Sequence, residues 1–190
     1  MSNFACIIIG ASTGGPKALR VILQDLPSNL SVPIYLVQKI PPGLFSESLA
    51  DGLNEVTELN VHVFDNKKIP QSGEAVLIPG GYNMIRDGGN LKMIEVEAVY
   101  NNTPHLDTTF REIHNFYDRP ILCVLLTGMF IDDDPLRVLY AIKENGGKII
   151  VQDPNTCFIP NMPKYLIDND CYDKVSPLQE LAKDILQYLK

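Results

Sequence analysis

Short apolar runs alternate along this chain with longer stretches in which apolar residues recur every three or four positions. The runs are almost continuous in Ile, Leu, Val and Cys, a pattern typical of strands that are buried on both faces. Such alternation predicts an α/β fold of three layers, in which a mainly parallel sheet carries helices on both faces. The expected strands are residues 5–9, 34–38, 61–64, 75–78, 121–126 and 148–151. The expected helices are residues 16–25, 45–55, 106–117, 135–145 and 178–189.

One segment departs from this alternation. Residues 82–86 and 91–94 both have the pattern of strands, and residues 87–90 between them read Asp-Gly-Gly-Asn, which is typical of a tight turn. This segment predicts a β-hairpin, so we expect the sheet to carry an antiparallel piece. The chain shows no repeat, low-complexity tract or linker, and residues 1–190 are therefore expected to form a single domain.

The charge of the chain excludes some classes of partner. Its 190 residues carry a net charge of −7, with a pI near 4.9, which argues against nucleic acid or an anionic membrane as the partner. No apolar run approaches the roughly 18 residues of a membrane span, and the first residues lack the segments of an export signal. We therefore expect a cytoplasmic protein that is not inserted in a membrane. The four cysteines show neither a disulfide framework nor zinc spacing.

The most informative local pattern surrounds Ser12. Residues 7–15 read IIIGASTGG, so an apolar run leads into a serine among small residues, and Pro16 follows at the expected start of a helix. A serine in such a strand–turn–helix context can be an exposed nucleophile. The free N–H groups and positive dipole end of the following helix favour a developing oxyanion.

Two other interpretations of this loop are open. One is a structural turn between strand and helix. The other is a phosphate-binding loop, because such loops also place glycines at a helix N-terminus. The Walker pattern requires Lys and then Ser or Thr after its last glycine, whereas Pro16 and Lys17 follow here. The dinucleotide fingerprint requires glycine at the position of Ser12, so both phosphate motifs are near misses.

A nucleophile needs a base, an orienting acid and oxyanion donors. In an open parallel sheet these groups gather at the carboxyl ends of the strands. Lys39 follows the expected strand 34–38, and Asp132 follows the expected strand 121–126. Ser12, Lys39 and Asp132 are therefore expected to converge at one edge of the sheet.

Several blocks of the chain, in this order, resemble one known family. They are IIIGASTGGPKAL, LVQKIPPGLF, LIPGGYNM, TPHLDTTFREI, LLTGMFIDD and NMPKYLI. With this order and spacing the chain resembles the catalytic domain of the chemotaxis protein-glutamate methylesterases, the CheB family. Members of that family usually also carry an N-terminal receiver domain, whereas this chain begins at the first strand of the catalytic domain.

The resemblance implies an activity and a set of site residues. The family hydrolyses methyl esters on glutamate side chains of chemoreceptor cytoplasmic helices, and many members deamidate receptor glutamines, with a Ser-His-Asp triad. By motif, Ser12 takes the position of the nucleophile and Asp132 that of the triad acid. Thr13 and Met129 take the positions that shape the oxyanion site. No cofactor is expected.

The chain departs from the family pattern at residues close to the expected site. Lys39 stands where the family has the triad histidine, Asn83 replaces a histidine in the P-G-G-x-H block, and Asn102 falls in the segment that the family writes H-R-P-S-V-D. Phe130 replaces the glycine after Met129. The last change affects the geometry of the turn and access of substrate.

Lys39 changes the expected chemistry. A general base works best with a pKa near the working pH, which imidazole has at about 6.5 and a lysine amine, at about 10.4, does not. Neighbouring carboxylates favour the ammonium form of a lysine. We therefore expect Lys39 to be a protonated ion-pair partner of Asp132. His105 is the substitute base to consider, although a structural role at the start of a helix is the simpler interpretation.

Residues 132–134 are three consecutive aspartates, which could hold Mg²⁺. A triad acid at Asp132, and Asp134 as the N-cap of a helix with Pro135 at its first position, account for them without a metal.

Three functional hypotheses follow from the sequence. The first is a glutamyl methylesterase of the CheB type, with weakened turnover. The second is a catalytically impaired module of the same family that binds a chemoreceptor or another signalling partner. The third is a serine hydrolase with a different substrate and with Lys39 or His105 as base. The oligomeric state leaves no signal in the sequence.

Overall fold

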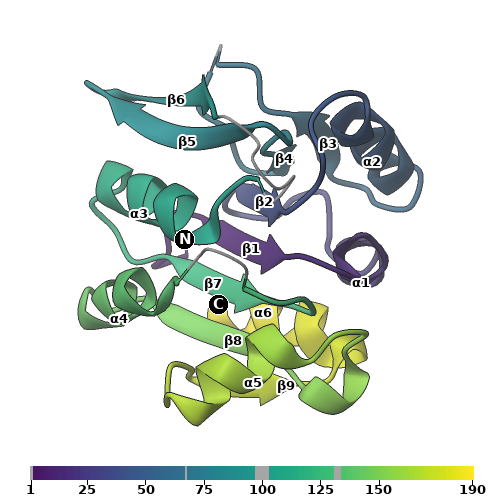
Figure 1. Cartoon of the computed structure of the whole chain (residues 1–190), viewed down its shortest axis with the longest axis vertical. Helices are drawn as coiled ribbons and strands as arrows, with labels where there is room; N and C mark the ends of the chain where they lie inside the picture. The colour runs from purple at the N-terminus through teal and green to yellow at the C-terminus, as the bar shows by residue number, and fades with distance from the viewer. Residues whose placement is uncertain (1, 67, 97–102, 131–133) are drawn as a thin grey trace.

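A computed structural model describes residues 2–66, 68–96, 103–130 and 134–190, and everything below concerns those residues. Its core is one sheet of seven parallel strands in the order β3-β4-β2-β1-β7-β8-β9 (Figure 1). The strands are β1 (Ile7–Ala11), β2 (Ile34–Gln38), β3 (Asn60–Val63), β4 (Glu74–Leu77), β7 (Leu122–Leu125), β8 (Lys148–Gln152) and β9 (Lys174–Ser176). The two central strands, β1 and β7, pair with each other, and β2 and β8 flank them.

Six α-helices in the described part of the chain cover the sheet, three on each face. Helices α1 (Gly15–Leu23), α2 (Phe45–Asn54) and α6 (Leu181–Tyr188) pack against one face, and α3 (Leu106–Phe116), α4 (Leu136–Glu144) and α5 (Asn161–Asp168) pack against the other. Successive residues of the central strands point to opposite sides, as the pleat requires. In β1, Ile7 and Ile9 belong to the first core and Ile8 to the second, so the apolar run fills both. The three-layer α/β fold predicted from the sequence is confirmed.

The hairpin is present, as β5 (Tyr82–Asp87) and β6 (Asn90–Glu95), but it is not part of the main sheet. The expectation of an antiparallel piece within that sheet is wrong: the two strands pair only with each other in the described residues. Met84 and Leu91 are buried in the core on the α3 side, so the hairpin covers that side as a flap (Figure 1). Packing against α3 stabilises it, because an isolated two-stranded hairpin is marginal in water.

The expected helices and strands are all present, with ends within two residues of those predicted, except that α6 begins three residues later than expected, after a 3₁₀ turn at Leu178–Glu180. Among the described residues, one α-helix and one strand were not predicted, namely α5 and β9. Helix α5 is short and has Pro163 near its start, a position where proline is tolerated because the first N–H groups of a helix have no partner within it. Strand β9 has three residues, which is too short to show a periodic pattern. None of the helices that the structure describes is long and apolar enough to span a bilayer.

Candidate active site

Ser12 is the first residue beyond β1, at the carboxyl edge of the sheet. Its backbone N–H donates to the carbonyl of Thr127 at 3.1 Å, and its own carbonyl accepts from the N–H of Gly15 at 2.8 Å. Gly14 has φ of +87°, a left-handed conformation that turns the chain directly into α1. The turn therefore places Ser12 at the N-terminus of α1, and 9% of the residue is exposed.

Gly10 has a different role from the one that the motif predicts. The strand continues through Gly10 and Ala11, so Gly10 lies within β1 and outside the turn. A Cβ at this position would lie 2.9 Å from both Leu125 Cδ1 and Phe110 Cζ. Glycine is needed here because α3 packs closely on the strand.

Gly128 shapes the site from the neighbouring strand. It follows β7 with φ of +143°, and a Cβ on it would lie 2.4 Å from the Cβ of Ser12. Its N–H donates to the carbonyl of Ile159, and its carbonyl accepts from the N–H of Met162, both at 2.8 Å. The start of α5 therefore fixes the loop against which Ser12 packs.

Lys39 lies beside Ser12 on the next strand. Ala11 and Gln38 are partners in the register of β1 and β2, so Ser12 and Lys39 each follow one member of that pair. The N–H of Lys39 donates to the carbonyl of Ala11 at 2.9 Å, and 8% of the lysine is exposed. Asp132 falls outside the described residues, so its ion pair with Lys39 stays a prediction.

The two residues expected to shape an oxyanion site lie on the two loops just described. Thr13 is exposed at the turn, and Met129, which follows Gly128, is half-buried. In the described part of the chain, neither N–H donates to a protein acceptor. Their oxyanion role therefore stays a prediction.

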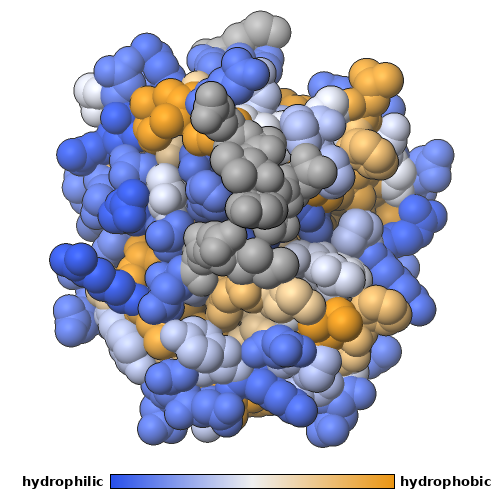
Figure 2. Space-filling model, viewed as in Figure 1, coloured by the Kyte–Doolittle hydropathy of each residue, from blue (hydrophilic) through white to orange (hydrophobic). Residues whose placement is uncertain are grey.

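Phe130, which departs from the family pattern, packs against α5. Its ring and that of Tyr165 form an edge-to-face pair with centroids 5.5 Å apart. Figure 2 shows apolar side chains gathered on this face of the molecule between β7 and α5. The substitution is thus accommodated by an aromatic contact, which builds an apolar wall next to Met129.

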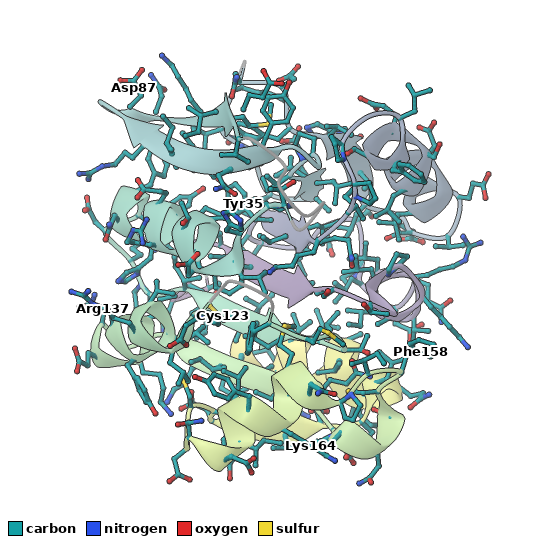
Figure 3. The ribbon with its side chains drawn as sticks, viewed as in Figure 1. Tyr35, Asp87, Cys123, Arg137, Phe158 and Lys164 are labelled. Carbon is teal, nitrogen blue, oxygen red and sulfur yellow. The ribbon has the colours of Figure 1, made fainter. Side chains whose placement is uncertain are left out.

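On the other side of the serine turn lies Phe158, labelled in Figure 3, which is 74% exposed. A Cβ on Gly14 would lie 2.7 Å from the Cβ of Phe158, so the two residues are in direct contact. A groove of about 330 Å³ adjoins this contact and is lined by, among others, Lys17, Thr127 and Cys157. Burial raises the pKa of the Cys157 thiol to about 11, with a smaller contribution from Asp153, so this thiol is not a thiolate nucleophile at neutral pH.

His105 lies at the N-terminal end of α3 and is held by Asn83. The backbone N–H of His105 donates to Asn83 Oδ1 at 2.7 Å. This contact directs Asn83 Nδ2 at the ring atom His105 Nδ1, 3.0 Å away. The hydrogen-bond network thereby assigns the acceptor role to Nδ1 and the proton to Nε2. Two of the residues near the predicted site thus support each other, and this arrangement favours the structural interpretation of His105.

Two glutamines in this region were not singled out from the sequence. Gln38 ends β2, Gln152 ends β8, and they are 2% and 1% exposed. Gln152 Oε1 accepts from the N–H of Thr127 at 2.9 Å, and Gln38 Nε2 donates to the carbonyl of Ser12 at 3.0 Å. The sequence feature that could have indicated them is a glutamine directly after the apolar residues of a strand, as in IYLVQ and KIIVQ.

The aspartate run is described only in part. Asp133, like Asp132, lies outside the described residues, and Asp134 Oδ1 accepts from the N–H of Leu136 at 3.1 Å. Helix α4 begins at Leu136, so Pro135 occupies the N-cap position, one residue before its predicted place. Within the described residues, no group of three or more His, Cys, Asp and Glu side chains is arranged to hold a metal ion.

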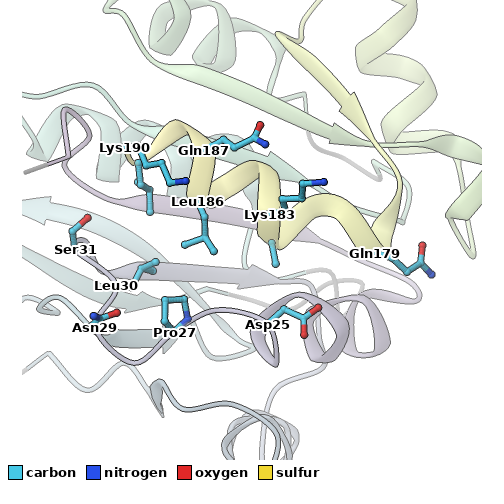
Figure 4. A pocket seen from close by; sticks show the side chains of 12 residues that line it. Asp25, Pro27, Asn29, Leu30, Ser31, Gln179, Lys183, Leu186, Gln187 and Lys190 are labelled. Atoms are coloured by element: carbon cyan, nitrogen blue, oxygen red, sulfur yellow. The ribbon is translucent and has the colours of Figure 1, made fainter.

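A larger groove, of about 560 Å³, lies away from this site. It runs between α6 and the segment of residues 25–31, and Figure 4 shows Leu30 and Leu186 facing each other across it. Neither Ser12 nor Lys39 lines it. The chemistry-bearing residues therefore gather at the carboxyl edge of the sheet, away from this groove.

Comparison with known proteins shows which proteins this chain resembles. The family model described as CheB methylesterase matches residues 7–185. The chain is 34% identical over 189 residues to a protein-glutamate methylesterase/protein-glutamine glutaminase of Archaeoglobus fulgidus, and 35% identical over 185 residues to one of Trichodesmium erythraeum. These alignments cover 97% and 95% of this chain but 53% and 52% of the relatives, so the chain spans about half their length.

A solved structure has the same fold. The crystal structure of the Thermotoga maritima CheB methylesterase catalytic domain superposes with a TM-score of 0.85, at 29% sequence identity. The match covers 97% of this chain and 98% of that one. The fold predicted from the sequence thus has an experimental counterpart over nearly its whole length.

Proposed function

Because the chain belongs to the CheB methylesterase family, we propose that it is a serine hydrolase that removes the methyl group from methyl-esterified glutamate side chains of proteins. The observation that supports this most directly is the position of Ser12. It lies between the end of β1 and the N-terminus of α1, with the loop of Gly128 packed against it. In such a turn the hydroxyl can reach an ester carbonyl while backbone N–H groups face the same point.

The reaction would proceed through an acyl-serine. Ser12 Oγ adds to the ester carbonyl, its proton passes to a base, and the C–O bond to the methoxy group breaks, releasing methanol. Water then attacks the acyl-serine, giving free glutamate and the original hydroxyl. The N–H groups of Thr13 and Met129 would donate to the oxygen that becomes negative in both steps, with Asp132 stabilising positive charge beside the serine.

The substrate is proposed from the family. Methylated glutamates on the cytoplasmic helices of chemoreceptors are the expected esters, in keeping with an activity in the cytoplasm. The relatives from Archaeoglobus fulgidus and Trichodesmium erythraeum carry names that add protein-glutamine glutaminase. Deamidation of receptor glutamines is therefore a second reaction for the same site.

One observation favours a second candidate function, a module that binds a receptor or another signalling partner without turnover. Lys39 stands at the triad histidine position, and it is buried beside Ser12. Lysine lacks the imidazole that the family uses as general base, and the loss of a positioned general base typically lowers the rate about 10²–10⁴-fold. A residual rate from the oxyanion donors and from binding can persist.

Methanol release from a methylated chemoreceptor fragment separates the two functions. We expect slow release by the parent protein, no release by Ser12→Ala, and labelling of Ser12 by a fluorophosphonate. Binding of the receptor fragment without methanol release or labelling, in folded protein, would support the binding module and exclude the hydrolase. Absence of both binding and release would contradict both functions.

A further inference from the structure

Gln38 occupies the position from which one side chain can reach both residues of the proposed site. It is the last residue of β2, it is 2% exposed, and it is the register partner of Ala11, the residue before Ser12. From there Nε2 donates to the carbonyl of Ser12 at 3.0 Å and to the carbonyl of Lys39 at 2.8 Å. Both hydrogens of a single amide group are used to connect the two loops.

The orientation of this amide is fixed. A flipped amide would place Oε1 against two carbonyl oxygens and would lose both hydrogen bonds. In the observed orientation Oε1 is buried without a hydrogen-bond partner among the described residues. A buried acceptor without a partner destabilises the fold, and the flipped orientation would be worse because it would also lose both donations.

The free oxygen lies against the first residue of α1. A Cβ on Gly15 would lie 1.8 Å from Gln38 Oε1. The Gln38 side chain cannot rotate away from this clash, because both hydrogens of its Nε2 group are bonded to carbonyls. The N–H of the same Gly15 donates to the carbonyl of Ser12. The amide, the serine carbonyl and the start of the helix therefore form one packed unit.

We infer that Gln38 is a positioning residue, which holds the Ser12 turn and the loop of Lys39 in a single arrangement and so sets where the serine hydroxyl lies relative to residue 39. The inference rests on the proposed function, because it assigns to Gln38 an effect on the reactivity of Ser12. The amide touches only backbone atoms of both residues, so it acts through their placement and takes no part in bond making.

The second glutamine shows that the arrangement is repeated. Gln152 also ends a strand that flanks the central pair, and its amide joins the N–H of Thr127 to the carbonyl of Thr156, each at 2.9 Å. The loop that carries Gly128 is thus held from β8 in the way that the serine turn is held from β2. Strand-terminal amides fix both loops between which a substrate carbonyl must lie.

The test compares Gln38→Met with the parent protein. Methionine keeps the length and approximate volume of glutamine but donates no hydrogen bond. The measurement is the inactivation of Ser12 by a fluorophosphonate at several concentrations, which separates the maximal rate of labelling from the concentration for half-maximal rate. We expect the maximal rate to fall about tenfold or more, with less than a twofold change in the half-maximal concentration, because placement changes and binding does not.

Asn54→Leu is the control variant. Asn54 also bridges two backbone groups with its amide, the N–H and the carbonyl of Val61, but it does so between α2 and β3. Its loss should lower the melting temperature without changing the labelling rate. A folded Gln38→Met that labels at the parent rate overturns the inference, as does a loss of labelling in both variants in proportion to their loss of stability.

If the parent protein neither labels nor releases methanol, the proposed hydrolase fails, and hydrogen exchange then tests the positioning role by itself. The N–H groups of Gly15 and Lys39 donate to Ser12 and Ala11. In Gln38→Met these two should exchange at least tenfold faster than in the parent and in Asn54→Leu. Unchanged exchange at both amides overturns the inference independently of activity.

Discussion

The environment of Ser12 consists mostly of backbone. Its N–H and carbonyl are both bonded, Gly128 packs against its side chain, and the amide of Gln38 holds its carbonyl from β2. Only a glycine fits at residue 128, both because φ is +143° and because Ser12 occupies the space of a Cβ. Small changes next to the serine should therefore alter its reactivity more than they alter the fold.

Gly128→Ala tests this conclusion. We expect stability to fall by about 1–3 kcal/mol from backbone strain, and the labelling rate of Ser12 to fall more than tenfold because the new methyl group displaces the serine. Urea unfolding and fluorophosphonate labelling are the measurements. Gly88→Ala is the matched control: Gly88 has φ of +60° but no atom near the position of a Cβ, so the strain should appear without the loss of labelling.

Lys39→His is the second change at this scale. An imidazole at this position can accept the serine proton, so we expect methanol release to rise about 10²–10⁴-fold, with a pH profile that increases as the imidazole loses its proton near pH 6.5. The double variant Ser12→Ala/Lys39→His should show none of this gain. A folded but inactive Lys39→His would point to Phe130, Asn83 or Asn102 as the cause of impairment.

At the scale of elements, α6 is attached to the edge strand β9 by a buried carboxylate. Asp184 is 5% exposed; Oδ1 accepts from Lys174 Nζ at 2.7 Å and Oδ2 from Ser176 Oγ at 2.6 Å. Burial by itself raises the pKa of Asp184, but the hydrogen bonds from Lys174 and Ser176 outweigh it and leave the pKa below its ordinary 3.8. The charged form is therefore the one that stabilises the fold.

Asp184→Asn should destabilise the protein by about 1–3 kcal/mol at pH 7, measured by urea unfolding. Because the folded protein holds the carboxylate more strongly than the unfolded chain, the contribution is fully present above the unfolded pKa of about 3.9 and is lost as the pH falls through the folded pKa. As the pH falls from about 5 into the acid range, the free energy of unfolding should therefore decrease more for the parent than for Asp184→Asn.

Glu180→Gln serves as the comparison for this ion pair. Glu180 pairs with Lys183 at 3.1 Å on the surface, where both side chains are more than half exposed. Exposed pairs contribute about 0–1 kcal/mol, so this variant should unfold almost as the parent does at each pH. If Asp184→Asn and Glu180→Gln lowered the free energy of unfolding equally, a special role for Asp184 would be contradicted.

At the scale of the whole molecule, the sheet unites the two cores. Alternate residues of β1, β2 and β7 enter the core under α1, α2 and α6 or the core under α3, α4 and α5. Exposing either core to water would uncover one face of the same central strands. We therefore expect the described chain to behave as one cooperative unit.

Thermal unfolding provides the measurement. Far-ultraviolet circular dichroism and the near-ultraviolet signal of the tyrosines should give the same midpoint, and the calorimetric enthalpy should equal the van't Hoff enthalpy. At about 0.7 kcal/mol per residue near 60 °C, that enthalpy should be about 130 kcal/mol. Two separate transitions would show that the prediction of a single domain over residues 1–190 is wrong.

Local patterns were sufficient for most elements. The apolar runs of β1 and β7 predict buried parallel strands, because a strand covered on both faces has no polar side to show. The small residues around Ser12 predict the turn for a similarly local reason. The run of β2 also predicted that Lys39 would lie at the edge of the sheet, next to Ser12.

The sequence by itself thus determined the α/β fold and the strand–turn–helix at Ser12, since each follows from the spacing of residues within a short segment. It also predicted that Lys39 lies at the same edge as Ser12, because the carboxyl ends of parallel strands meet there. Only the tertiary structure decided that Gly10 is required under α3, that the hairpin stands apart from the sheet, and that Gln38 and Gln152 hold the two loops. These features depend on contacts between segments that are distant along the chain. No local pattern records such contacts, because a glutamine at the end of a strand has the same sequence signal whether or not a carbonyl lies within its reach.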